Sequence, residues 1–178
     1  MNGVQQPSGQ GRRVAEFLAI AGVSAAVDLG TKAWAVAALA DLPGQTKVVA
    51  APWLDVVLRY NRGTAFSAIF DLGETIRVIL GVASLAIVVA LLLWARRPET
   101  STLERWSAGI LAGGAIGNGW DRVFREAPGG GTGVVDFVKI NYPWGGSWPA
   151  FNVADALLVV GIGLLLIAWR GGSAAQAE

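Results

Sequence analysis

The stretch VILGVASLAIVVALLLWA, residues 78–95, decides the fold class of this sequence. It contains no charged residue, is rich in Leu, Val and Ile, and is followed directly by Arg96 and Arg97. A helix needs roughly 20 predominantly apolar residues to cross the ~30 Å hydrocarbon core of a bilayer. The stretch therefore predicts a transmembrane helix over about residues 76–95.

Three further segments extend this pattern on both sides, at about residues 14–40, 104–124 and 151–169. Each reaches membrane-crossing length only if polar residues are included, although 53% of the 178 residues are hydrophobic. That fraction is high for a soluble domain of this size. The sequence predicts a membrane all-α bundle of four transmembrane helices, formed by one domain at 14–170, with a disordered tail at 1–13 and a second tail at 171–178.

Two longer segments, at about 41–73 and 127–150, connect the predicted spans on one side of the membrane. Residues 46–60, TKVVAAPWLDVVLRY, and residues 134–140, VVDFVKI, contain β-branched and alternating stretches that are typical of strands. We expect them to form a small β-cradle on the outer face of the membrane.

Basic residues indicate how the spans are oriented. The two sides carry similar numbers of Lys and Arg, but on one side they lie densely beside the spans, which is typical of the cytoplasmic side. These residues are Arg12, Arg13, Arg96, Arg97, Arg105 and Arg170. The sequence therefore predicts a multi-pass protein with both termini in the cytoplasm.

Two residue types are missing from the composition, and their absence restricts the chemistry. Without cysteine there is no thiolate nucleophile or disulfide, and without histidine there is no Ser-His pair or His-ligated zinc. A net charge of +1 with no run of Lys and Arg gives no basis for nucleic-acid binding. Catalysis would have to rest on Asp, Glu, Lys, Ser, Thr or Tyr, and we predict no metal and no cofactor.

Several polar residues lie inside predicted spans, where an ionisable group costs at least ~2.5–3.5 kcal/mol. Asp28 and Lys32 are four residues apart and share a helix face, so the favoured interpretation is an internal ion pair that holds the bundle together. In GGAIGNGWDR, residues 113–122, the glycines allow another helix to approach closely. Asn118 and Arg122 face one way there, and Asp121 can balance a nearby cation, which leaves a structural polar patch and a functional site both open.

Outside the spans, Asn61 and Gly63 belong to a turn in NRGTAFS, residues 61–67, that follows the strand-like run. Asn152 and Asp155 lie in the first turn of the last predicted span, where a helix cap is the simplest interpretation. Asp136, between apolar neighbours, would ordinarily support the fold through a hydrogen bond.

Together, Asp136 and Asp155 predict more than either does alone. They bracket a short outer segment, so the fold can bring them side by side at the membrane surface. Two neighbouring carboxyl groups do not both ionise easily and share a proton, so that one acts as a base towards water and the other polarises a carbonyl. A pair of Lys32 with Ser67 is the alternative hydrolytic arrangement, and no spacing supports it.

The sequence resembles a known family, the bacterial lipoprotein signal peptidases (signal peptidase II), over nearly its full length after residue 14. Five motifs appear in the family's order together with the four predicted spans. They are DLGTK at 28–32, NRGTAF at 61–66, GGAIGN with DR at 113–122, VVDF at 134–137 and WPAFNVAD at 148–155.

The resemblance implies a four-helix membrane bundle with an outer β-cradle and an aspartyl protease dyad formed by Asp136 and Asp155. It implies a second set of residues that line or support the site, namely Asn61, Gly63, Asn118, Arg122, Asn152, Asp28, Lys32 and Asp121. The implied substrate is a prolipoprotein whose cysteine carries diacylglycerol, cut on the amino side of that cysteine. The site would lie near the outer face of the bacterial inner membrane, in contact with lipid, and would bind inhibitors such as globomycin.

Two other classes of function are compatible with four spans. A small transporter would use intramembrane Asp and Lys residues to relay protons or bind a solute, and inverted repeats would favour it, but none is apparent. An assembly protein held by glycine-rich contacts would keep its function when Asp136 is replaced by Asn.

Overall fold

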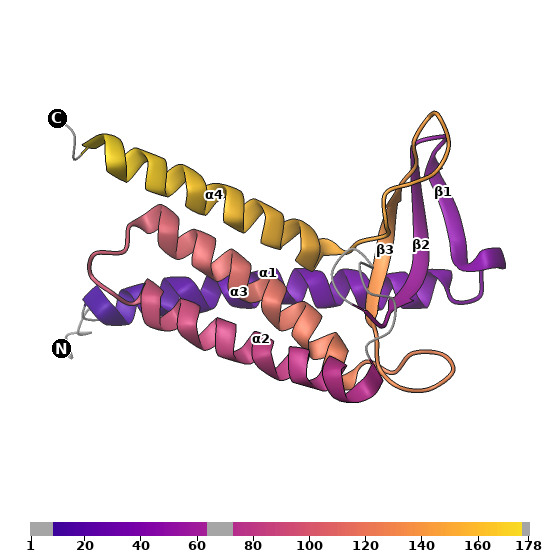
Figure 1. The fold of residues 1–178 in the computed structure, drawn as a ribbon, viewed down its shortest axis with the longest axis horizontal. Helices are drawn as coiled ribbons and strands as arrows, with labels where there is room; N and C mark the ends of the chain where they lie inside the picture. The colour runs from indigo at the N-terminus through magenta and orange to yellow at the C-terminus, as the bar shows by residue number, and fades with distance from the viewer. Residues whose placement is uncertain (1–8, 64–72, 176–178) are drawn as a thin grey trace, which may run out of the picture.

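The computed structural model describes residues 9–63 and 73–175, which form a helical bundle with a small sheet at one end (Figure 1). The helices are α1 (Gly9–Leu39), the short 3-10 helix η1 (Pro43–Gln45), α2 (Gly73–Ala95), α3 (Thr102–Phe124) and α4 (Val153–Ala175). The strands are β1 (Thr46–Ala50), β2 (Leu54–Asn61) and β3 (Val134–Ile140). The predicted helical bundle with a small sheet is confirmed.

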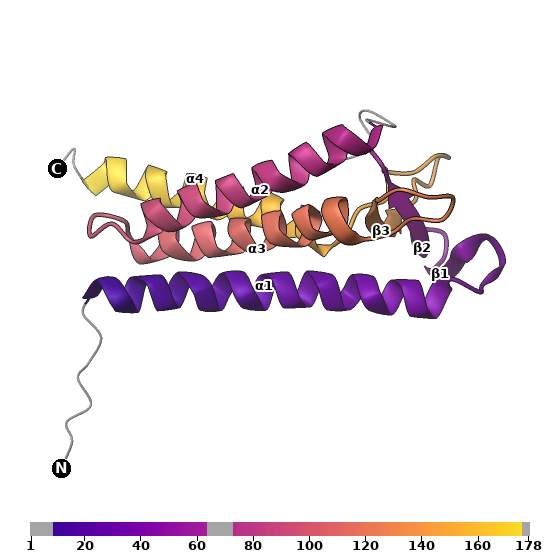
Figure 2. The same ribbon diagram turned by 90° about the horizontal axis from the view of Figure 1, so that it is seen from below.

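Helix α3 is the central helix of the bundle and packs against α1, α2 and α4 (Figures 1 and 2). Its glycines make these close contacts possible. A Cβ atom added to Gly113 would lie 2.2 Å from the Ser24 Cβ of α1, and one added to Gly117 would lie 2.1 Å from the Asp28 carboxylate. The glycine-rich composition of α3 therefore follows from its position between three neighbours.

Three of the helices are long and apolar enough to cross a membrane, as judged over the part of the chain that the structure describes. They are α1, α2 and the Val153–Arg170 part of α4. Helix α3 does not meet this criterion, because many of its surfaces face other helices and it carries buried polar residues such as Asn118 and Asp121. The number of four crossings therefore stays a prediction.

Two helices extend into the segments that the sequence assigned to tails. Helix α1 begins at Gly9, before the predicted start at 14, and an ion pair of 2.8 Å between Arg12 and Glu16 joins its first turns. Helix α4 continues past Arg170 to Ala175. Hydropathy identifies the part of a helix that lies in lipid, not the residue at which helical hydrogen bonding ends. The remaining tail residues, 1–8 and 176–178, lie outside the described ranges.

The three strands form an antiparallel sheet in the order β1-β2-β3, so the prediction of strands in the two connecting segments is confirmed. One face of the sheet packs on the end of α1 and contains a buried apolar cluster of Ala35, Leu39, Leu58, Val135 and Phe137. Strand periodicity then turns residue 136 to the opposite face. Arg59 of β2 is the cross-strand partner of Asp136.

Candidate active site

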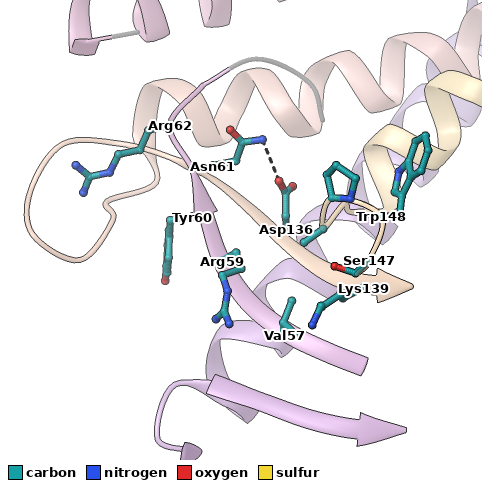
Figure 3. Close-up of a pocket in the computed structure, with 11 residues that line it drawn as sticks. Val57, Arg59, Tyr60, Asn61, Arg62, Asp136, Lys139, Ser147 and Trp148 are labelled. Carbon is teal, nitrogen blue, oxygen red and sulfur yellow. Dashed lines mark hydrogen bonds between the residues drawn. The ribbon is translucent and has the colours of Figure 1, made fainter. Parts of the chain in front are cut away.

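Asp136 lies in the middle of β3, next to the end of the bundle, and its residue surface is 3% exposed. Both carboxylate oxygens accept hydrogen bonds from side-chain amides. Asn61 Nδ2 donates to Oδ2 at 3.0 Å, as Figure 3 shows, and Asn152 Nδ2 donates to Oδ1 at 2.7 Å. Neutral amide donors therefore hold this carboxyl group in a buried position.

Asp155 lies in the first turn of α4 and forms a reciprocal cap with Asn152. The Asp155 backbone N–H donates to Asn152 Oδ1 at 3.0 Å, and the Asn152 backbone N–H donates to Asp155 Oδ2 at 3.2 Å. This is the geometry of a capping box, so the helix-cap interpretation describes the local structure correctly. The second oxygen, Oδ1, accepts a hydrogen bond from Asn118 Nδ2 at 2.9 Å.

The structure brings Asp136 and Asp155 together, because Asn152 contacts both carboxyl groups. Burial raises the pKa of Asp136, and the negative charge of Asp155 raises it further, to about 7. The hydrogen bonds from Asn61 and Asn152 act in the opposite direction and are weaker effects. Near neutral pH the Asp136 carboxyl group is therefore poised between its protonated and ionised forms.

Lys32 lies in the bundle interior and has three oxygen neighbours, one for each proton of its ammonium group. Its Nζ atom is 2.7 Å from Asp28 Oδ2, 3.1 Å from Asp121 Oδ2 and 2.9 Å from Asn118 Oδ1. The predicted ion pair between Asp28 and Lys32 is present, with completely buried side chains. Lys32 also fixes Asn118, the residue that donates to Asp155.

The two aspartates of this cluster reach the elements that carry Asp136 and Asp155. Asp28 Oδ1 accepts the backbone N–H of Ala154, in the first turn of α4, at 2.7 Å. Asp121 Oδ2 accepts the backbone N–H of Val135, in β3, at 3.2 Å. Each contact is made one residue before a member of the carboxyl pair. No feature of the sequence predicted these two contacts, because each joins segments that lie in different elements.

Arg122, Asn61 and Gly63 complete the surroundings of the pair. The Arg122 guanidinium interacts electrostatically with Asp155 and Asp136, and its Nε atom is buried without a hydrogen-bond partner among the described residues. Its Nη1 donates to the Asn118 carbonyl oxygen at 3.1 Å. The backbone N–H of Gly63 donates to Asn61 Oδ1 at 2.9 Å, a turn that orients the Asn61 amide towards Asp136. Ser67, the alternative nucleophile, lies outside the described residues.

Two hollows open beside the carboxyl pair. The first has a volume of about 480 Å³ and lies over the sheet, with Asp136, Arg59, Lys139 and Trp148 among its lining residues (Figure 3). The second is an apolar groove of about 380 Å³ along α4. It is lined by Ile140, Trp148, Phe151, Asp155, Ala156, Val159 and Val160. The sequence did not single out Arg59, Lys139 or Trp148, although strand alternation places Arg59 on the same face as Asn61.

Comparison with known proteins supports the resemblance found in the sequence. The family described as Signal peptidase (SPase) II matches residues 20–170. A lipoprotein signal peptidase of a Methylobacterium species is 39% identical over 151 residues, which cover 84% of this chain and 86% of that protein. One from Rhodopseudomonas palustris is 34% identical over 151 residues, covering 83% of this chain and 87% of that protein.

Two solved structures of bacterial membrane enzymes have a similar fold. A structure described as a bacterial membrane enzyme superimposes with a TM-score of 0.71 at 25% identity, covering 89% of this chain and 90% of that one. A second bacterial membrane enzyme structure gives a TM-score of 0.66, also at 25% identity, and covers 87% of this chain and 92% of that one. The chain therefore belongs to the signal peptidase II family of lipoprotein-processing membrane proteases.

Proposed function

We propose that this protein is an aspartyl endopeptidase that removes the signal peptide from diacylglyceryl-modified prolipoproteins, cutting on the amino side of the lipidated cysteine. The observation that carries the proposal is the pair of Asp136 and Asp155, tied together by Asn152 beside two open hollows. The chain contains no histidine or cysteine that could act instead. Membership of the family supports the removal of signal peptides from lipoproteins.

The proposed reaction begins with one proton on the pair, which we place on Asp136 because its pKa is raised to about 7. Asp155 takes a proton from water while the water oxygen attacks the scissile carbonyl carbon. Asp136 gives its proton to the carbonyl oxygen, so a neutral tetrahedral diol forms. In its collapse Asp136 recovers a proton from a hydroxyl, Asp155 protonates the leaving nitrogen, and the C–N bond breaks. The products are the free carboxyl end of the signal peptide and the amino group of the lipidated cysteine.

The neighbouring residues position this reaction. We assign Arg122 to a substrate backbone carbonyl, because its buried Nε lacks an acceptor among the described residues and its charge lies near both carboxyl groups. Asn61 and Asn152 hold Asp136, and Asn118 holds Asp155. Asp28, Lys32 and Asp121 support the site from inside the bundle through the contacts described above. Globomycin-type inhibitors would occupy the same space as the substrate.

The proposed membrane arrangement has all four helices crossing the bacterial inner membrane. The start of α1 and the end of α4 lie at the same end of the bundle, opposite the sheet (Figure 1). The density of arginine beside the spans supports a cytoplasmic location for that end. The carboxyl pair then lies near the outer face, where a lipidated substrate enters sideways from the bilayer. The apolar groove beside Asp155 offers a surface for its lipid or its apolar signal segment.

Cleavage of a diacylglyceryl-modified prolipoprotein by the purified protein tests the proposal. Asp136→Asn and Asp155→Asn are each expected to lower kcat by roughly 10²-fold or more, because each removes one acid-base group. Asp41→Asn, at an exposed position before the sheet, serves as the matched control and keeps full activity. Cleavage retained by folded dyad variants would refute the mechanism. Failure of the folded wild type to cut several lipidated substrates would refute the function.

A further inference from the structure

The hollow over the sheet has opposite electrostatic character at its two ends. Asp136 lies at the end that meets the bundle, while Arg59 and Lys139 extend away from it and flank Val57 (Figure 3). Arg62 adds a third cation to the lining. Among the described residues that line this hollow, Asp136 is the one acid. A bound polypeptide that leaves the carboxyl pair in this direction therefore meets positive charge.

The three cations differ in the hydrogen bonds and ion pairs that they form within the protein. Arg62 Nη2 donates to the carbonyl oxygens of Pro128 and Gly130, so it fixes the glycine-rich loop. Lys139 Nζ is 3.7 Å from the carboxylate of Asp55. Arg59 is exposed, donates to the carbonyl of its neighbour Leu58, and has no ion-pair partner in the described part of the chain. Arg59 is therefore the cation most available to a ligand.

The position of the hollow determines which part of the proposed substrate it can receive. The sheet lies beyond the ends of α3 and α4 (Figure 1), whereas the apolar groove is lined mainly by residues of α4. A signal segment and lipid chains require the apolar side. The polypeptide after the cysteine enters water, so the polar hollow over the sheet suits it better than the apolar groove does. Arg59 is the cross-strand neighbour of Asp136, so an extended chain at ~3.3 Å per residue passes it within its first few residues.

We propose that the hollow lined by Arg59 and Lys139 is a binding site for the first residues after the lipidated cysteine, and that it favours acidic side chains there over basic ones. This inference rests on the proposed function and adds a selection that the cleavage chemistry alone does not require. The attraction acts between partly exposed charges, so it weakens as salt is added.

Competition between two matched lipidated substrates tests the inference. They differ only in carrying Asp or Lys at the second residue after the cysteine, and a second pair carries the same exchange ten residues further on. At low salt the wild type is expected to cleave the Asp substrate with a kcat/KM about two- to fivefold higher, the range of an exposed ion pair. The second pair is expected to show no difference.

Substitution of Arg59 tests whether the preference for the Asp substrate arises in this hollow. Arg59→Gln is expected to reduce it and Arg59→Glu to reverse it, while Lys47→Gln leaves it unchanged. Lys47 is the matched control because it is an exposed cation on the same sheet that does not line the hollow. Equal cleavage of the first pair by the wild type, or a preference that survives in Arg59→Glu, would overturn the inference while the proposed function stands. Cleavage of neither substrate would overturn both.

Discussion

The interior of the bundle and its rim both bury aspartates, but they treat the negative charge in opposite ways. In the interior, Asp28 and Asp121 share the ammonium group of Lys32. At the rim, Asp136 and Asp155 lie near each other and near the Arg122 guanidinium, and the hydrogen bonds to their carboxyl oxygens come from asparagine side-chain amides. The first arrangement places a cation against each carboxylate, and the second raises the pKa of Asp136 through burial and the nearby charge of Asp155.

The comparison indicates that the interior cluster supports the structure and that the pair at the rim carries the reactivity. Salt-bridged carboxylates are poor acids and bases near neutral pH because their charge is already satisfied, so the interior cluster is suited to support. Its aspartates hold the backbone of α4 and β3 beside the carboxyl pair. The pair at the rim keeps its reactivity because no cation of the cluster contacts it directly. Asn118 connects the two regions as a neutral spacer between Lys32 and Asp155.

Removal of Lys32 is the largest expected disturbance. Lys32→Met leaves Asp28 buried without a cation, while Asp121 keeps its ion pair of 2.6 Å with Arg125. The variant is expected to destabilise the protein by about 3–5 kcal/mol. The measurement is thermal unfolding in detergent, with Lys47→Met as the exposed control. A double variant that adds Asp28→Asn removes the stranded charge and should recover part of the loss. An unchanged Tm in Lys32→Met would show that the interior cluster does not stabilise the fold.

The rim should respond to pH near neutrality through Asp136. Because the pKa of Asp136 is raised from an ordinary 3.8 to about 7, the folded state binds this proton more tightly than the unfolded state. The contribution of Asp136 to the free energy of unfolding is fully present below pH ~4 and is lost as the pH rises through about 7. At ~1.36 kcal/mol per pKa unit, the loss amounts to at most about 4 kcal/mol.

Asp136→Asn cannot ionise and is expected to lose less stability over that range. Unfolding measured at intervals between pH 4 and 8 compares this variant with the wild type. Parallel curves would mean that Asp136 has an ordinary pKa. Activity should follow the same proton, with kcat/KM of the wild type falling above pH ~7.

A change in the spacing between α1 and α3 beside the interior cluster should have an intermediate effect. Gly117→Ala places a Cβ atom 2.1 Å from Asp28 Oδ2, so α1 and α3 have to move apart. Overpacking of this kind typically costs about 1–3 kcal/mol. Gly163→Ala, at a helical position on α4 with open space around it, is the matched control and should be neutral or slightly stabilising. Equal Tm values for the two variants would contradict the close packing at Gly117.

The smallest expected effect on stability is at Asn152, where two variants separate helix capping from the hydrogen bond to Asp136. Asn152→Ala should lose about 1 kcal/mol through the cap and also lose the donor to Asp136. Asn152→Ser keeps a good cap but lacks the amide donor, so it should recover the stability of the wild type and not its activity. Paired measurements of Tm and of prolipoprotein cleavage decide the point. Recovery of full activity in the Ser variant would limit Asn152 to capping.

Much of the architecture was predictable because hydropathy and alternation are local properties. The uncharged run at 78–95 indicated a span, and β-branched alternation at 134–140 indicated a strand. Helix α3 was harder to classify as a span, because a central helix exchanges apolar side chains for glycines and buried polar groups. Helices α1 and α4 extend beyond the predicted spans, because no change of hydropathy marks the residue at which a helix ends.

By itself, the sequence determined the residue types available for chemistry and the family to which they belong. The absence of histidine and cysteine left carboxyl groups as the candidate acid and base, and the order of the motifs indicated the family. Only the tertiary structure decided which groups meet: Lys32 with Asn118 across 86 positions, Asp28 with Ala154 across 126, and Arg59 beside Asp136. Such contacts depend on the packing of α3 against its neighbours and on the register of the sheet, which local sequence patterns do not encode.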